Sequence, residues 1–493
     1  MKEEDETKLS STLASAKTNP PEPQLKVSQK ANTGPIPRVR ALKETVLSQF
    51  NIEKITRLSE TESLTLYVDK ITDEKVQLTI YAKPKSAKPK ETRTEFAVEA
   101  GRILALDHPA VLKGKQLLED KKSFAIVWEA AEGGVLLSEA GNLDIEVVTK
   151  LAVQLFEAFA YCHNQGITHL RLSPAHLLLT EPPAAQSWVL KLAGLDESRA
   201  FAGKSVSLGS VSPFIAPEVY AGEGCKGSDL WSCGVVLYSL TTGSLPFLED
   251  EYSEAVRACR PLQVQLTEEK WASAASPALQ ALVLSLLSWD PAVRPSAVQC
   301  LQHPSFKSTQ TASDMRYLTD SMSTVATVKS VNNKLKTEVK RFVMESAKQQ
   351  AHLAKLREVF RQLDVDGDGM INKTELRGGL AKVLPAEQVD SECERIFKAA
   401  DFNDSGELDY SEFLLVSYSD KDLFSTENLR SAFDRLDLNR SGNVRLDELG
   451  AMFKGKARSK LEKQLLSLRT KYTNELDFIE FQEIVLKSQV VSG

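Results

Sequence analysis

The sequence predicts an α+β domain followed by an all-α domain, and three patterns support this fold class. Between residues 50 and 130, apolar and polar residues alternate in short runs, which is typical of half-buried strands. From residue 143 to residue 305, apolar residues recur at the spacing of amphipathic helices. In the last third, acidic loops begin at Asp364, Asp401 and Asp437, which are 37 and 36 residues apart, so a helix–loop–helix unit repeats.

The composition of the 493-residue chain limits the class of protein. A net charge of −6 argues against a nucleic-acid partner, because phosphate binding needs a basic excess. No apolar run is long enough to span a membrane, and Lys2 stands where N-myristoylation requires glycine, so no membrane anchor is evident. The six cysteines are scattered, as is typical of reduced thiols. We expect a cytoplasmic protein, and an association with the cytoskeleton is left open.

The chain divides into four segments. Residues 1–45 are poor in aromatic residues and rich in Lys, Glu, Ser, Thr and Pro, which predicts a disordered tail. Residues 50–306 form the predicted α+β domain, and residues 357–487 contain the repeated units. Between them, residues 320–356 predict an amphipathic junction helix. Its basic part, residues 325–345, is a candidate intramolecular target for the grooves of the following units, and permanent packing on a neighbour is the alternative.

The first two acidic loops have the composition of EF-hand calcium sites. Ca²⁺ takes oxygen ligands from positions 1, 3, 5, 7, 9 and 12 of a twelve-residue loop that has glycine at position 6. The ligands expected from these loops are Asp364, Asp366, Asp368, the Met370 carbonyl, Asn372 and Glu375, and then Asp401, Asn403, Ser405, the Glu407 carbonyl, Asp409 and Glu412. We predict that both loops bind calcium.

The third loop is a weaker candidate and the fourth is degenerate. The third loop offers Asp437, Asn439, Ser441, the Asn443 carbonyl and Glu448. It has Arg445 at position 9, where a cation adds repulsion, so we expect lower affinity. Counting back from Glu480 puts Arg469 and Lys471 at positions 1 and 3 of the fourth loop, which predicts a structural unit paired with the third. Residues 357–487 are therefore predicted to form a calmodulin-like domain of four EF-hand units.

Residues 50–306 carry motifs that support the protein-kinase scaffold. Ala216-Pro217-Glu218 matches the A-P-E motif. The segment that begins at Asp229 resembles the helix that anchors the large lobe, and Arg294 resembles the residue that pairs with the A-P-E glutamate. These motifs occur in the right order, so they predict a bilobal protein-kinase-like domain.

The positions that carry the chemistry of this fold hold other residues. Aligned with the H-R-D-L-x-x-x-N loop, the sequence has Arg171 at the general base and His176 at the metal-binding Asn. Thr79 stands at the strand lysine, and Gly194 stands at the Mg²⁺-binding Asp. Residues 58–64, where the Gly-rich loop is expected, contain no glycine. We therefore expect no catalytic residues, and these four positions are degenerate.

Three further residues bear on this expectation. Glu99 keeps the place of the helix glutamate without its lysine partner, and Asp196 lies two positions after Gly194. Trp128 precedes the predicted hinge, where it either fills the adenine pocket or packs in the core. Loss of a single electrostatic group costs about 10²–10³ in rate. The sequence thus gives no support for ATP or Mg²⁺ binding, and nucleotide binding without catalysis stays open.

The order of these segments resembles the calcium-dependent protein kinase family, over about residues 50–485. Leu106-Asp107-His108-Pro109 and the hinge-like segment 129–134 add to the resemblance. The family joins a kinase domain, an autoinhibitory junction and a calmodulin-like domain. The resemblance implies this architecture and a calcium switch. The departures at the catalytic motifs imply that the activity does not carry over.

Three functions follow from this reading. The main hypothesis is a calcium-binding pseudokinase that acts in signalling as a calcium-regulated scaffold or allosteric partner of other proteins. One alternative is an active or weakly active calcium-dependent Ser/Thr protein kinase that uses ATP. The other is a constitutive structural component of a larger assembly. The partner, the calcium affinity and the oligomeric state do not follow from the sequence.

Overall fold

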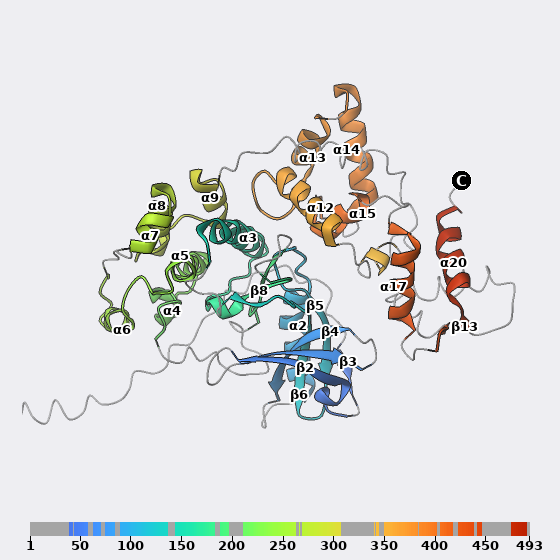
Figure 1. Cartoon of the computed structure of the whole chain (residues 1–493), viewed down its shortest axis with the longest axis horizontal. Coiled ribbons are helices and arrows are strands. Elements are labelled where there is room, and N and C mark those ends of the chain that lie inside the picture. Colours follow the sequence, from blue (N-terminus) through green and yellow to red (C-terminus); the bar gives the residue numbers. More distant parts are fainter. Residues whose placement is uncertain are drawn as a thin grey trace, which may run out of the picture.

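The structure is a computed structural model of the chain (Figure 1). It describes residues 39–306 except 43, 58–62, 71–73, 84–88, 137–142, 183–187, 197–210, 263–265 and 267–268, then residues 340 and 342–344, and finally residues 350–490 except 383, 402–404, 418–422, 438–440 and 446–474. Within this part, no helix is both long enough and apolar enough to cross a membrane.

A six-stranded sheet and one helix form the small lobe of the α+β domain. The strands are β1 (Val39–Ala41), β2 (Phe50–Arg57), β3 (Ser63–Asp69), β4 (Lys75–Ala82), β5 (Gly114–Glu119) and β6 (Ser123–Glu129). Their order is β1-β5-β6-β4-β3-β2, and every neighbouring pair is antiparallel except β1 and β5. Helix α2 (Pro89–Leu104) buries Phe96, Ala100 and Ile103, so one face of this helix belongs to the core.

Strand β1 corrects the predicted boundary of the N-terminal tail. Residues 39–41 were expected to lie in a disordered segment, but Val39 is buried and pairs with Leu117 in parallel register. Val46, in the 3-10 turn η1 (Val46–Gln49), is also buried. The error arises because the partner strand lies more than 70 residues further along the chain. Most of the predicted tail lies outside the described residues.

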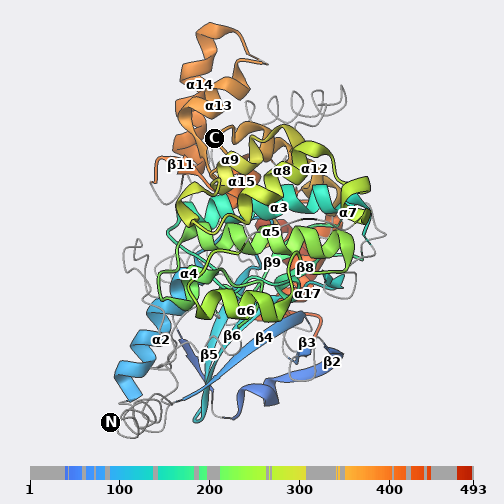
Figure 2. The same cartoon turned by 90° about the vertical axis from the view of Figure 1, so that its left-hand side faces the viewer.

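Helices dominate the large lobe, as predicted for residues 143–305 (Figure 2). The lobe contains β7 (Gly134–Val135), α3 (Ile145–Asn164), η3 (Pro174–His176), β8 (Leu177–Leu179), β9 (Leu190–Leu192), α4 (Pro217–Tyr220), α5 (Lys226–Thr242), α6 (Glu249–Arg257), α7 (Glu269–Ala274), α8 (Pro277–Leu286), η4 (Pro291–Val293), α9 (Ala297–Leu301) and η5 (Pro304–Phe306). Helix α5 is buried from Ser228 to Thr241, so it forms the centre of the lobe.

The predicted scaffold ion pair is present in the large lobe. Arg294 donates to both carboxylate oxygens of Glu218, at 2.6 and 3.0 Å. Its side chain also donates to three main-chain carbonyls, of Gly227, Ser288 and Trp289. The Arg294 side chain is fully buried, and a buried charge needs such complete pairing.

Paired helix–loop–helix units form the C-terminal domain. Its elements are α12 (Gln350–Leu363), β10 (Ile371–Asn372), α13 (Lys373–Leu380), α14 (Ala386–Ala400), β11 (Glu407–Leu408), α15 (Tyr410–Ser417), α17 (Thr426–Leu436), β12 (Val444–Arg445), β13 (Glu475–Leu476) and α20 (Phe478–Val490). Strand β10 pairs with β11, and β12 pairs with β13. The fourth unit is therefore joined to the third, as predicted.

The predicted junction helix 320–356 is described at Lys340, at residues 342–344 and from residue 350, where α12 begins and continues across the predicted domain boundary to Leu363. Lys340 and residues 342–344 are helical, and Val343 and Met344 are buried in the core of the C-terminal domain. Lys340 is only 2% exposed. The end of the junction thus packs with the EF-hand units. The rest of the predicted target segment 325–345 lies outside the described residues.

Candidate functional sites: a remodelled cleft and paired calcium loops

Thr79 lies on β4 at the position predicted for the catalytic lysine, and it contacts Trp128. Thr79 pairs with Ile126 on β6, and the Trp128 indole Nε1 donates to Thr79 Oγ1 at 2.9 Å. Trp128 is 5% exposed, so the ring is packed in the core beside the hinge. The Thr79 hydroxyl, which is hydrogen-bonded to the indole, carries no positive charge and cannot replace a lysine as the partner of a phosphate.

Tyr81 closes the same face of β4 against the large lobe. Side chains two residues apart in a strand share a face, so Tyr81 lies beside Thr79. The Tyr81 hydroxyl donates to Asp196 Oδ2, and its ring packs on Phe96 of α2 at 5.9 Å. Asp196 is 3% exposed. The carboxylate that follows Gly194 is therefore bonded to the small lobe.

His176 occupies the space beside Gly194. Gly194 has a φ of +76°, and a Cβ added there would lie 2.4 Å from His176 Cδ2. The His176 ring is held from the other side, because the Ser173 main-chain N–H donates to its Nδ1 at 3.1 Å. Both positions predicted to have lost a Mg²⁺ ligand thus lie in contact. Any side chain at position 194 would therefore require the His176 ring or the backbone to move.

The backbone of the catalytic loop keeps its anchor although its side chains have changed. Asp229 of α5 accepts the main-chain N–H of His169 at 3.0 Å and of Leu170 at 2.6 Å. Leu170 has a φ of +64°, which is rare outside glycine, so these bonds hold a strained turn. Arg171 follows at the predicted base position, and a guanidinium cannot accept a proton.

Other charged groups near the cleft are paired elsewhere. Lys83 at the end of β4 donates to Glu119 at 2.8 Å and to the Asp120 carbonyl at 2.7 Å, so it does not replace the lysine missing at Thr79. Glu99 lies 3.5 Å from Arg102 on its own helix. The sequence indicated that Glu99 lacks the strand lysine as its partner, but it did not indicate that Arg102 takes this place.

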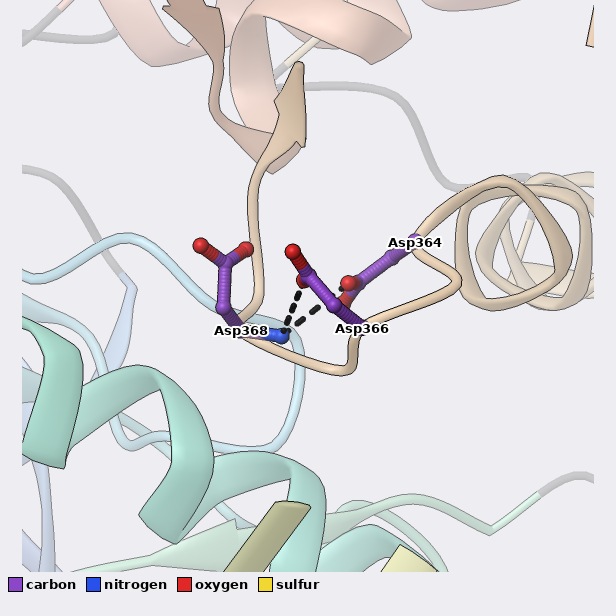
Figure 3. A group of neighbouring side chains, drawn as sticks. All are labelled: Asp364, Asp366 and Asp368. Atoms are coloured by element: carbon purple, nitrogen blue, oxygen red, sulfur yellow. Dashed lines mark hydrogen bonds between the residues drawn. The ribbon is translucent and has the colours of Figure 1, made fainter. Parts of the chain in front are cut away.

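The first calcium loop brings three predicted ligands together. Oxygen atoms of Asp364, Asp366 and Asp368 lie within 4.8 Å of one another, and this is the one such cluster found among the described residues (Figure 3). The Asp368 main-chain N–H donates to Asp364 Oδ1 at 3.0 Å and to Asp366 Oδ1 at 3.2 Å, which shapes the turn. Glu375 accepts the N–H groups of Val365 and Asn372.

The electrostatics of this loop fit a divalent cation. Burial above all, together with the neighbouring carboxylates, raises the pKa of Asp364 to about 8 and of Asp368 to about 6. Burial also raises the pKa of Glu375. Negative charge is therefore unfavourable here unless a cation is present. The donors are all oxygen atoms, as Ca²⁺ prefers.

The second and third loops have the same frame in their described parts. Asp401 accepts the N–H groups of Ser405 and Gly406, both at 2.9 Å, and Asp437 accepts those of Ser441 and Gly442. The Ser405 and Ser441 hydroxyls donate to the position-7 carbonyls of Glu407 and Asn443. In the second loop, the Glu412 N–H donates to Asp409. The predicted ligands Asn403, Asn439 and Glu448 lie outside the described residues.

Known families match both halves of the chain. Residues 66–306 match the protein kinase domain, residues 353–418 match an EF-hand domain pair, and residues 429–454 match an EF hand. The chain therefore joins a protein kinase domain to EF-hand units, in the α+β then helical order that the sequence predicts.

Curated relatives make the assignment more specific. Calcium-dependent protein kinases 19 and 34 of Arabidopsis thaliana are 28% and 30% identical over 74% and 69% of this chain, and 68% and 65% of their own length is covered. Calcium-dependent protein kinase 4 of Plasmodium falciparum is 25% identical over 85% of this chain and 83% of its own. The chain belongs to the calcium-dependent protein kinase family. Its aligned part spans about two thirds of the plant relatives.

Proposed function

We propose that this chain is a calcium-binding pseudokinase, which acts as a calcium-regulated scaffold or allosteric partner of other proteins. The observation that carries this proposal is the contact between His176 and Gly194. His176 and Gly194 stand at the two positions where the kinase reaction uses Mg²⁺ ligands. The His176 ring fills the space that a side chain at position 194 would need. Restoring a single ligand would therefore not restore a metal site.

Two further replacements support the loss of phosphoryl transfer. Thr79 is bonded to Trp128 where a lysine would hold the phosphates, and Arg171 stands where a carboxylate would orient the nucleophile. Each loss removes a different part of the transition-state stabilisation, so no single neighbour compensates for all of them. ATP and Mg²⁺ are not expected to serve as cofactors.

The calcium half supplies the regulation in this proposal. The first two loops are the main Ca²⁺ sites, and the third is a weaker site. Calcium binding would reorganise the EF-hand helices and their hold on the junction segment 325–345. The burial of Val343 and Met344 among these helices supports an intramolecular role for the junction. A cytoplasmic location remains a prediction, and no described contact supports an association with the cytoskeleton.

The second candidate is an active or weakly active Ser/Thr protein kinase. The names of the relatives favour it, because they are calcium-dependent protein kinases. In this case Asp196, a buried carboxylate two positions after Gly194, would replace the metal ligand missing at Gly194. It would first have to release the Tyr81 hydroxyl.

Radiolabelled ATP separates the two candidates. The full-length protein is incubated with generic protein substrates, with Mg²⁺ or Mn²⁺, in calcium and in chelator. We expect no incorporation above that of a heat-treated sample. Calcium-dependent incorporation that disappears in an Asp196→Ala variant would refute the pseudokinase proposal. In parallel, thermal unfolding should shift upward with Ca²⁺ and not with Mg²⁺ and ATP, because a ligand that binds only the folded state stabilises it.

A further inference from the structure

The first calcium loop lies against the large lobe of the kinase domain. Asn164, the last residue of α3, donates from Nδ2 to Asp368 Oδ2 at 3.2 Å, although the two residues are 204 positions apart. Figure 3 shows this loop above a helix in the colour of α3, with Asp368 on the side of that helix. A predicted calcium ligand thus has a hydrogen-bond partner from the other domain.

The loop also packs closely on the lobe. Gly369, with a φ of +82°, lies so near α3 that an added Cβ would be 2.6 Å from Tyr161 Cβ. The next residue, Met370, is 7% exposed and belongs to the apolar core of the kinase domain. The glycine at position 6 therefore serves the domain contact as well as the turn of the loop.

The two oxygens of Asp368 have different partners. Oδ1 accepts the Met370 main-chain N–H at 2.9 Å, inside the loop, whereas Oδ2 faces Asn164. Position 5 of an EF-hand loop needs only one oxygen for the cation. The bond from Asn164 is therefore compatible with calcium binding, and it fixes the orientation of the carboxylate that binds.

Polar and charged groups of the two domains meet at this interface. Ser411 of α15 donates to Asp107 of the kinase domain at 2.5 Å. The Asp107 main-chain N–H in turn donates to the Tyr161 hydroxyl of α3 at 2.8 Å. Arg361 of α12 lies 3.8 Å from Glu157 of α3, so an ion pair also joins the domains.

We propose that the kinase domain acts as an outer shell for the first calcium site, with Asn164 as a positioning residue for Asp368. Outer-shell partners orient metal ligands, and their loss lowers metal affinity. Because coupling between two equilibria is reciprocal, calcium in the first loop would also strengthen the contact between the domains. This inference rests on the calcium binding in the proposed function and not on the loss of catalysis.

Calcium titration calorimetry of the full-length protein tests this proposal. In a Glu412→Gln background, which weakens the second site, the strongest calcium binding that remains is that of the first site. There Asn164→Ala should raise the calcium dissociation constant about three- to tenfold, as expected for one exposed hydrogen bond to a charged group. Asn164→Asp should raise it more, because it places a second carboxylate against Asp368. The matched control is Asn51→Ala, on exposed β2, which should change nothing.

A second background distinguishes positioning from a general loss of structure. Glu375→Gln weakens the first site, so Asn164→Ala should leave the remaining calcium affinity unchanged there. Equal losses in both backgrounds, or a change below twofold in the Glu412→Gln background, would overturn the inference. If the unmodified protein binds no calcium at all, the proposed function fails instead. Thermal unfolding in chelator should be the same for Asn164→Ala and the parent, because Asn164 is exposed.

Discussion

The contact between His176 and Gly194 can be tested by the addition of one methyl group. Gly194→Ala places a Cβ 2.4 Å from His176 Cδ2 and puts an L-residue at a φ of +76°. The left-handed backbone costs about 1–2 kcal/mol, and overpacking typically costs about 1–3 kcal/mol. We therefore expect Gly194→Ala to lower the free energy of unfolding of the kinase domain by about 2–5 kcal/mol.

A double-mutant cycle with His176→Ala separates the two contributions. Without the imidazole ring, the methyl group at Gly194 meets no overlap, and only the backbone cost of about 1–2 kcal/mol remains. The coupling energy should therefore be about 1–3 kcal/mol. Gly134→Ala is the matched control, because Gly134 has a φ of +88° and its Cβ position is open. Its cost should not depend on His176.

Tryptophan fluorescence during urea unfolding is the suitable assay. All five tryptophans lie between residues 128 and 289, so their emission follows the kinase domain and not the EF-hand units. The calcium concentration is kept constant so that linked binding does not contribute. The reasoning is refuted if Gly194→Ala costs no more than Gly134→Ala, or if its cost is the same with and without His176.

Four further predictions concern charged groups. Calcium affinity should fall as the pH is lowered from about 8 to about 6 in calorimetry, because the raised pKa values of Asp364 and Asp368 make protons compete with the cation. Because the pKa values of Asp364 and Asp368 are raised in the folded state, the calcium-free folded protein binds more protons than the unfolded chain. Its free energy of unfolding in chelator should therefore fall as the pH rises from about 6 to about 8. A calcium affinity or a free energy of unfolding that does not change with pH in this range would contradict the corresponding prediction. Arg294→Ala should destabilise the kinase domain by about 3–5 kcal/mol in the fluorescence assay, because it leaves Glu218 buried without its cation, and a loss below about 1 kcal/mol would contradict this. Glu375→Gln should abolish high-affinity calcium binding at the first loop and remove one site from the titration, whereas an unchanged stoichiometry would show that this loop is not a site.

Motif spacing predicted the positions that lie on regular elements. Thr79 does lie on strand β4, where it pairs with Ile126, whereas its alignment with the strand lysine stays a prediction. The partnership of Glu218 and Arg294 was predictable because both residues belong to recurring kinase motifs. In the calcium loops, the apolar residues at position 8 of the first two loops, Ile371 and Leu408, pair as short strands.

Contacts between distant segments were not predictable from one sequence where no recurring motif marks both partners. The Tyr81–Asp196 bond joins residues 115 positions apart, although the alternation along β4 could have shown that Tyr81 shares a face with Thr79. The pairing of Val39 with Leu117 and the bond from Asn164 to Asp368 likewise depend on the path of the whole chain. Local patterns give the type of an element, whereas such contacts arise only when the lobes pack.

The replacements in the cleft are connected with one another. Trp128 binds Thr79, Tyr81 binds Asp196, and His176 fills the space beside Gly194. Each pair therefore makes a packing or hydrogen-bonding contact of its own. The Tyr81–Asp196 hydrogen bond joins the two lobes, whereas the Thr79–Trp128 bond lies within the small lobe and the His176–Gly194 contact lies within the large lobe. Reversing one member of a pair would leave its partner misfitted, so the pseudokinase proposal predicts that a single reversal does not give catalytic activity. This physical coupling supports the proposal that the kinase domain serves as a stable surface under calcium control.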